Sequence, residues 1–251
     1  MNTAAGRSLA RLTALLALTL NQFAHAESSH WGYEGKTGPG SWGDLGGSCG
    51  SGQGQSPIDI SRMGQTAAKP KSLPNLIFRW KQSKGEVINN GHTLQVNVGR
   101  GNETRVGSDR YELTQFHFHV PSEHRFDGRN APMEVHFVHR GSNGKLLVVG
   151  VMIQVAGKNE PLAPVFTKPP RTTSVRRQVS IDLPKIPPVA HAYFAYQGSL
   201  TTPPCSEGVN WVLLKNSISI SSNQYKVFKS MFGNNARPPQ PLNGREVAVT
   251  E

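Results

Sequence analysis

Residues 113–124 read LTQFHFHVPSEH, in which two histidines alternate with two phenylalanines. Successive side chains of a β-strand point to opposite faces of the sheet. We therefore expect Gln115, His117 and His119 on one face, and Phe116 and Phe118 on the other. A lone buried histidine is usually a core residue with satisfied hydrogen bonds, but packing alone does not explain two on one face. The stretch predicts a strand with an apolar face and a polar site.

A second run, MEVHFVHR at residues 133–140, repeats this alternation. It places Glu134 and His136 on one face, and the turn-rich residues between the two runs are long enough to connect antiparallel neighbours. Pairing these strands brings His136 to His117 and His119. Three imidazoles with a fourth position open are the ligand set of a catalytic zinc site. Three neutral nitrogens also accept cobalt, copper or nickel, so the residue types leave the metal open.

Two polar residues lie beside these predicted ligands. Gln115 precedes His117 by two residues and Glu134 precedes His136 by two, so each pair shares a face. A ligating imidazole usually donates its second N–H to a carboxylate, carbonyl or amide. We expect the Gln115 and Glu134 side chains to be these acceptors. His124 and His139 lack such support and are expected to be structural.

The rest of the chain is typical of short strands separated by turns. It contains 26 glycines and 18 prolines, with strand-like runs between them,. One helix is expected over residues 221–232, with Ser222 as its cap. The sequence therefore predicts one mainly β domain with short helices. Strand-like runs occupy residues 76–80, 93–98, 111–120, 133–140, 145–155, 191–200 and 209–216.

The first 26 residues have the pattern of an export signal. Arg7 and Arg11 precede an uncharged stretch at residues 12–20, and AHA follows at residues 24–26. This pattern predicts a cleavable secretory signal peptide over residues 1–26 and a mature domain over residues 27–251. The apolar stretch is too short to span a bilayer and no later one is longer, so no membrane anchor is expected. We expect a periplasmic protein, or a secreted one if the host lacks an outer membrane.

The formal net charge of +11 raises the question of a nucleic-acid partner,. The positive charges are spread along the chain apart from a modest cluster at residues 168–177, and no nucleic-acid-binding module accompanies them,. We therefore expect a solvated basic surface and no nucleic-acid partner.

Cys49 and Cys205 are the only cysteines. In an exported protein, a lone pair most simply forms a disulfide. Two unrelated buried thiols are the alternative that composition leaves open.

Seven stretches of the chain resemble the α-class carbonic anhydrases, especially the exported bacterial members. In chain order they are HWGYEG, QSPIDI, INNGH, QFHFHVPSEH, MEVHFVH, GSLTTPPCSEGVNW and ARPPQPLNGR. The resemblance implies one domain built on a large twisted, mostly antiparallel central β-sheet, with short helices around it. It also implies one zinc ion per chain, held by His117, His119 and His136. The implied reaction is reversible hydration of CO2 to bicarbonate and a proton through a zinc-bound hydroxide.

The resemblance also implies roles that spacing alone does not. Thr201 would orient the zinc hydroxide and hydrogen-bond to Glu123, while His92 occupies the position of the proton shuttle. Cys205 would hold the loop that carries Thr201, and Asn235 and Arg237 would be structural. Tyr33, Asn90 and Gln95 match the water-filled side of the active-site cleft, and Val138, Val148, Leu200, Trp211 and Thr202 match the substrate pocket. Gln95 and Leu147 are pocket residues less typical of the animal enzymes.

Two competing interpretations follow from the same residues. An H-x-H pair followed by Glu123 also resembles the first half of a cupin metal motif, in which Glu123 would be a ligand, but a second motif is missing. A carbonic anhydrase-like binding protein without activity would normally lack some ligands, and all three histidines are present.

The family also implies sulfonamide and small-anion inhibitors, and homodimers among its bacterial members.

Overall fold

The computed structural model describes residues 1, 30–61 and 69–250. The chain divides into two units, Met1–His30 and Trp31–Glu251, and all the helices and strands given below belong to the second. The predicted signal peptide lies outside the described residues from residue 2 onward. Within the described ranges, no helix is long and apolar enough to cross a membrane.

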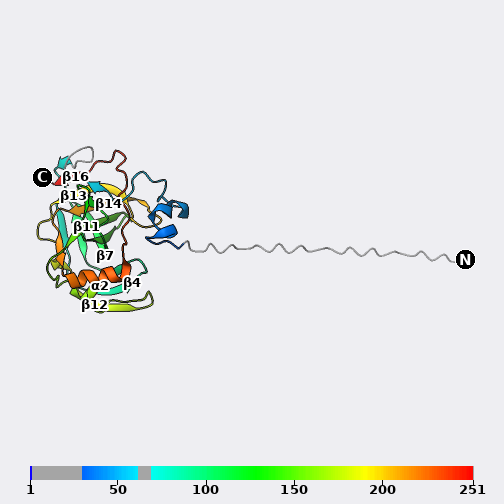
Figure 1. The fold of residues 1–251 in the computed structure, drawn as a ribbon. Coiled ribbons are helices and arrows are strands. Elements are labelled where there is room, and N and C mark those ends of the chain that lie inside the picture. The colour runs from blue at the N-terminus through cyan, green and yellow to red at the C-terminus, as the bar shows by residue number, and fades with distance from the viewer. Residues whose placement is uncertain (2–29, 62–68, 251) are drawn as a thin grey trace. The chain divides into compact units, whose positions relative to one another are not determined.

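A sheet of 13 strands forms the body of the second unit (Figure 1). All neighbours in it are antiparallel except β11 with β14 and β15, and β16 with β2. The predicted mainly β fold with a twisted, mostly antiparallel sheet is therefore confirmed. Along the main path the strands are β12 (Arg176–Asp182), β4 (Gln82–Asn89), β5 (Leu94–Val98), β7 (Asp109–His119), β10 (Met133–Gly141), β11 (Leu146–Val155), β14 (Glu207–Leu214), β13 (Tyr193–Ser199), β16 (Ala248–Thr250) and β2 (Lys69–Lys71). Beside this path, β15 (Ile218–Ile220) pairs with β11, and β6 (Glu103–Val106) pairs with β7 and with β3 (Leu76–Arg79).

The remaining elements are short. A small sheet contains β1 (Asp59–Ile60), β8 (Arg125–Phe126) and β9 (Arg129–Asn130), and the helices are η1 (Gly35–Thr37), η2 (Pro39–Leu45), α1 (Ala163–Phe166), η3 (Leu183–Lys185) and α2 (Ser222–Phe232). The predicted cap of α2 was wrong by one residue. Ser221 is the cap, because its hydroxyl accepts from the Gln224 backbone N–H while the Gln224 side chain accepts from the Ser221 backbone N–H,.

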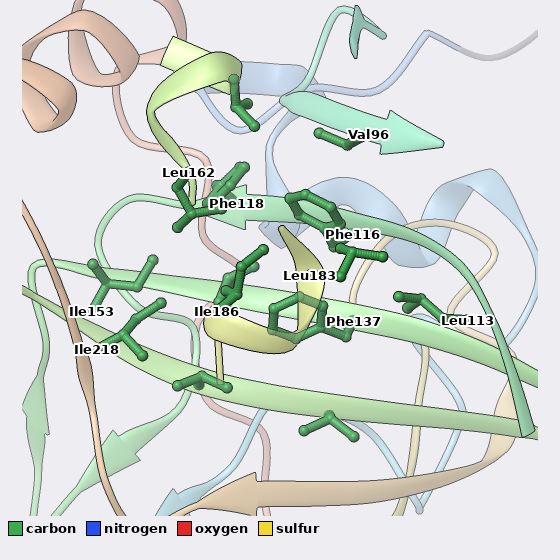
Figure 2. Packing of buried hydrophobic residues seen from close by; sticks show 14 of the residues in the cluster. Val96, Leu113, Phe116, Phe118, Phe137, Ile153, Leu162, Leu183, Ile186 and Ile218 are labelled. Carbon is green, nitrogen blue, oxygen red and sulfur yellow. The ribbon is translucent and has the colours of Figure 1, made fainter. Parts of the chain in front are cut away.

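The two faces of the central strands bury different kinds of side chain. Phe116, Phe118 and Phe137 are fully buried in the larger of two hydrophobic clusters, as the alternation predicted (Figure 2). His119 and His136 project from the same strands and are also buried. Because neighbours along a strand alternate in direction, the apolar cluster anchors the strands whose other face carries the imidazoles.

Candidate metal centre

The register of β7 and β10 brings three histidines together. His136 lies opposite His117, and Glu134 lies opposite His119. One ring nitrogen from each of the three histidines lies within 4.8 Å of the others. The rings are 4.6 to 5.4 Å apart between centroids. Two long antiparallel strands therefore place the predicted ligand set on one patch of the sheet.

The two predicted supporting side chains contact the imidazoles that they precede. The Gln115 side-chain oxygen lies 2.9 Å from Nδ1 of His117, and Glu134 Oε1 lies 2.8 Å from Nε2 of His136. An imidazole that donates from one nitrogen presents a lone pair on the other. These contacts therefore leave Nε2 of His117 and Nδ1 of His136 as the atoms that face the centre of the cluster.

His119 has a partner that no sequence pattern indicated. Its Nδ1 donates to the backbone carbonyl of Asn235, 2.8 Å away, and its Nε2 is buried without a hydrogen-bond partner among the described residues. Asn235 was expected only to be structural, and its carbonyl belongs to a loop 116 residues further along the chain. A buried nitrogen without a partner is costly unless something else binds it, so this atom fits a metal ion.

Burial favours the neutral form of His117 and His119. It lowers the pKa of His119 to about 4 and holds the pKa of His117 well below its ordinary value, with the neighbouring imidazoles adding to the effect on His117,. A neutral imidazole has a lone pair to offer, whereas a protonated one does not. At neutral pH these two imidazoles can therefore offer lone pairs to a cation.

Glu134 supports more of the site than its one predicted partner. Its Oε2 accepts from the backbone N–H groups of Glu123 and His124, and its Oε1 accepts from the rings of His124 and His136. Burial alone would raise the pKa of Glu134, but the two imidazoles and their hydrogen bonds hold it well below its usual range. His124, expected to be structural, thus helps to hold the carboxylate that orients His136.

This hydrogen-bond chain continues away from the imidazoles. Because His124 donates from Nδ1, its Nε2 accepts from the Tyr196 hydroxyl, 2.7 Å away. The Tyr196 oxygen in turn lies 2.8 Å from Oγ of Ser56. His124, Glu134 and His136 also form a geometrically compact cluster, and these hydrogen bonds account for it without a second metal ion.

A glycine on β11 makes room for this arrangement. Gly150 lies opposite His136 in the sheet. A Cβ atom at this position would lie 2.5 Å from Cδ2 of Leu213 and 2.9 Å from Oε1 of Glu134. Any side chain here would therefore displace the carboxylate that holds His136.

Glu123, the residue that the resemblance pairs with Thr201, is fully buried. Burial raises the pKa of Glu123 to about 7, while nearby His136, the Arg237 backbone N–H and the Thr201 hydroxyl each lower it. Glu123 Oε1 accepts from the Arg237 N–H at 2.8 Å, and Oε2 lies 3.9 Å from Nδ1 of His136. The carboxyl group thus lies beside the histidine cluster.

A disulfide joins Cys49 to Cys205, which confirms the predicted pairing. The loop after Thr201 is also held by backbone contacts: Ser48 N–H donates to the Pro204 carbonyl at 2.9 Å. The Gln55 amide donates to the Cys205 carbonyl at 3.1 Å. The segment that carries Thr201 is therefore fastened to residues from the beginning of the domain.

The predicted apolar wall forms a single cluster. Val148 and Trp211 are buried, with Val138 and Leu200 packed against the same cluster, and the Trp211 ring lies 4.9 Å from that of His136. Thr202 is half-buried, and its carbonyl accepts from the Cys205 N–H. Leu147 was wrongly expected in the pocket. Val138 pairs with Val148, so Leu147 points to the opposite face and joins the larger core.

His92 lies in an aromatic environment. Its ring stacks on Trp31, with centroids 3.6 Å apart and planes at 9°, and the Tyr33 ring lies 6.4 Å away. Burial raises the pKa of Tyr33 well above its ordinary value, and the Glu123 carboxylate adds to this. Trp31 was not singled out from the sequence. It belongs to the recognised stretch HWGYEG, but stacking between residues 31 and 92 depends on tertiary structure.

The fold and this histidine cluster define one class of protein, and comparison with known proteins agrees. The model of the eukaryotic-type carbonic anhydrase family matches residues 37–251. The chain belongs to the α-class carbonic anhydrases, which are lyases (carbonate dehydratases).

Individual relatives cover most of the chain. It is 41% identical over 250 residues to a carbonic anhydrase of Neisseria gonorrhoeae, covering 96% of this chain and 97% of that one. It is 39% identical to a carbonic anhydrase of Nostoc sp., with 89% and 87% covered. An α-carbonic anhydrase from Thermovibrio ammonificans, solved with the inhibitor sulfanilamide, superimposes with a TM-score of 0.83. That protein is 40% identical, and the match covers 88% of this chain and 99% of the other.

Proposed function

We propose that this protein catalyses reversible hydration of CO2 to bicarbonate and a proton, with one zinc ion per chain held by His117, His119 and His136. The observation that carries the proposal is the buried Nε2 of His119, which has no hydrogen-bond partner in the described part of the chain and lies beside two imidazoles whose second nitrogens are already engaged. Zinc bound there would lower the pKa of a water molecule at its open position to about 7, the value already known for carbonic anhydrases, and so supply a nucleophile at neutral pH.

The surrounding residues are proposed to orient the attacking group and to bind the substrate and product. Thr201 would donate to Glu123 and could then only accept a hydrogen bond from the attacking group, which would orient a lone pair towards the substrate carbon,. Thr202 follows Thr201 in the chain and is proposed to contact bicarbonate. Val138, Val148, Leu200 and Trp211 offer an apolar surface suited to a small uncharged gas molecule.

The proton must leave once water replaces bicarbonate. A histidine titrates near neutrality, so His92 is the proposed shuttle. Tyr33, Asn90 and Gln95 are proposed to order water between it and the site. As in the Thermovibrio ammonificans relative with sulfanilamide, we expect sulfonamides to bind here, as well as small anions.

Three further features of the protein are proposed from its sequence and family. Residues 1–26 act as a cleavable signal peptide, and residues 27–251 form the catalytic domain. The disulfide suits a protein exported to an oxidising compartment, such as the periplasm,. Assembly as a homodimer is proposed by analogy with bacterial members of the family.

The test is stopped-flow CO2 hydration by the zinc-loaded mature protein and its His119→Ala variant, with zinc content measured in both. We expect fast hydration by the first, and near-background hydration and loss of zinc in the second. His30→Ala is the control, because this exposed histidine is not one of the three proposed ligands. If the folded, zinc-containing wild type hydrates CO2 only at the background rate, the binding-protein interpretation replaces this proposal.

A further inference from the structure

Three amide side chains form a directed hydrogen-bond chain beside the histidine cluster. Asn90 follows β4, and Gln95 and Asn97 belong to β5. Asn90 Nδ2 donates to Gln95 Oε1 at 3.3 Å, and Gln95 Nε2 donates to Asn97 Oδ1 at 2.6 Å. Asn97 is half-buried and is not among the residues that the family resemblance assigned.

The direction of this chain is set by the backbone at one end. Asn90 Oδ1 accepts from the backbone N–H groups of His92 at 3.0 Å and Thr93 at 2.9 Å. Only a carbonyl oxygen can do this, so the Asn90 NH2 group must face Gln95. Gln95 must therefore accept through its side-chain oxygen, which directs its NH2 group towards Asn97. Asn97 must then present an acceptor, and a donor or an apolar group there would leave the Gln95 NH2 group without this partner.

The chain begins at the turn that carries His92 and follows β5, which pairs with the strand that carries His117. In the β5–β7 pairing, Gln95 lies opposite His117 and Asn97 lies opposite Gln115. Gln115 is the residue whose side-chain oxygen contacts Nδ1 of His117. The amides therefore run from the His92 turn along the strand that pairs with β7.

The side chain of Asn89 makes separate hydrogen bonds that hold the backbone of the His92 turn. Asn89 Oδ1 accepts from the Gly91 N–H at 2.9 Å, and its NH2 group donates to the Arg171 carbonyl at 3.3 Å. Gly91 has a φ of +90°, which suits glycine,. Since the backbone of the turn is held in this independent way, removing Asn97 should disturb the side-chain amides without unfolding the turn.

We propose that Asn97 is a positioning residue for proton transfer. As the terminal acceptor it holds Gln95 in one orientation, so that the amides next to the His92 turn present a single pattern of donors and acceptors to water. A proton moves along hydrogen-bonded water only where donors and acceptors follow in one sense, and a Gln95 amide free to rotate would interrupt that order. This inference rests on the proposed CO2 hydration and its His92 shuttle.

The test compares Asn97→Val, which removes the acceptor and suits a strand, with Asn97→Asp, which keeps an acceptor. Rates are measured on the alkaline plateau of the pH profile. There, the added charge of aspartate does not change the protonation state of the active site, so the variants can be compared directly. In weak buffer we expect Asn97→Val to lower kcat about fivefold, the ratio that corresponds to one hydrogen bond, with kcat/KM unchanged. Asn97→Asp should retain kcat, and a high concentration of imidazole, which accepts protons directly, should restore Asn97→Val.

A second readout does not depend on activity. In the metal-free protein, the side-chain NH2 resonances of Gln95 should shift in the NMR spectrum of Asn97→Val and stay near their wild-type positions in Asn97→Asp. Unchanged kcat, an equal fall in kcat and kcat/KM, or a loss that imidazole does not repair would each overturn the role of Asn97. A wild type without CO2 hydration would instead refute the proposed function, and the proton-transfer role with it.

Discussion

His139 offers a quantitative test of how a buried imidazole couples stability to pH. It is fully buried on β10, where it stacks near Trp80, and it is not part of the histidine cluster. Trp80 Nε1 donates to Thr104 Oγ1, which lies 2.9 Å from His139 Nε2, and His139 Nδ1 lies 3.3 Å from the Leu147 carbonyl. The carbonyl requires a donor at Nδ1, so Nε2 accepts from Thr104. A second proton on the ring would require the Thr104 hydroxyl to rotate and accept at this contact, and it would place a positive charge in a fully buried site,.

The size of the effect follows from the pKa. Burial lowers the pKa of His139 from 6.5 to about 4, although the Leu147 carbonyl partly opposes this. Between pH 6.5 and pH 4, the unfolded chain binds a proton at His139 more readily than the folded protein does. The stability that neutral His139 contributes is therefore complete above pH 6.5,. It is lost as the pH falls towards 4. The displacement corresponds to about 3 kcal/mol in the free energy of unfolding.

The assay is denaturant unfolding of the metal-free, disulfide-bonded protein between pH 7 and pH 4, followed by tryptophan fluorescence. The test variant is His139→Gln, because glutamine also offers one donor and one acceptor but does not titrate. Other groups titrate alike in both proteins, so the difference between them isolates His139. We expect the variant to gain about 3 kcal/mol relative to wild type on going from pH 7 to pH 4. Parallel stability curves for the two proteins would refute the reasoning.

Two further predictions concern the site and its loop. Gly150→Ala should displace Glu134 and weaken zinc binding by about 10- to 100-fold, as a competition titration with a chelator would measure, since ligand-supporting groups have effects of this size,. An affinity equal to wild type would contradict the packing. Replacing Cys49 and Cys205 together by serine should lower stability by about 2–5 kcal/mol in urea unfolding, because the disulfide closes a long loop,. An unchanged midpoint would show that the bond adds nothing.

The glutamate that supports His136 illustrates why such sites tolerate little change. Glu134 is buried and accepts four hydrogen bonds, so an amide in its place would set an NH2 group against at least one donor. The cost of a buried unsatisfied group is about 1–3 kcal/mol. The same residue therefore contributes both to the stability of the domain and to the orientation of a predicted ligand.

Much of the sheet and the core of the site could be predicted because the relevant signals are local. Alternation within residues 113–120 and 133–140 separates the phenylalanines from the histidines, and it needs only the two-residue period of a strand. Gln115 and Glu134 could be paired with His117 and His136 for the same reason, because residues two apart share a face. The family motifs added Thr201 and Glu123, whose meeting no local period predicts.

Contacts between distant segments were decided by the tertiary structure. The Asn235 carbonyl that holds His119, and the Trp31 ring that stacks on His92, come from loops whose positions no periodic pattern specifies. Leu147 was expected in the pocket together with its neighbour Val148, although successive residues of a strand point to opposite faces; Val148 packs with Val138, and Leu147 joins the larger core,. Alternation along one strand determines which residues share a face. Which face meets the site, and which distant backbone group completes it, depends on how the strands pair and where the loops pack.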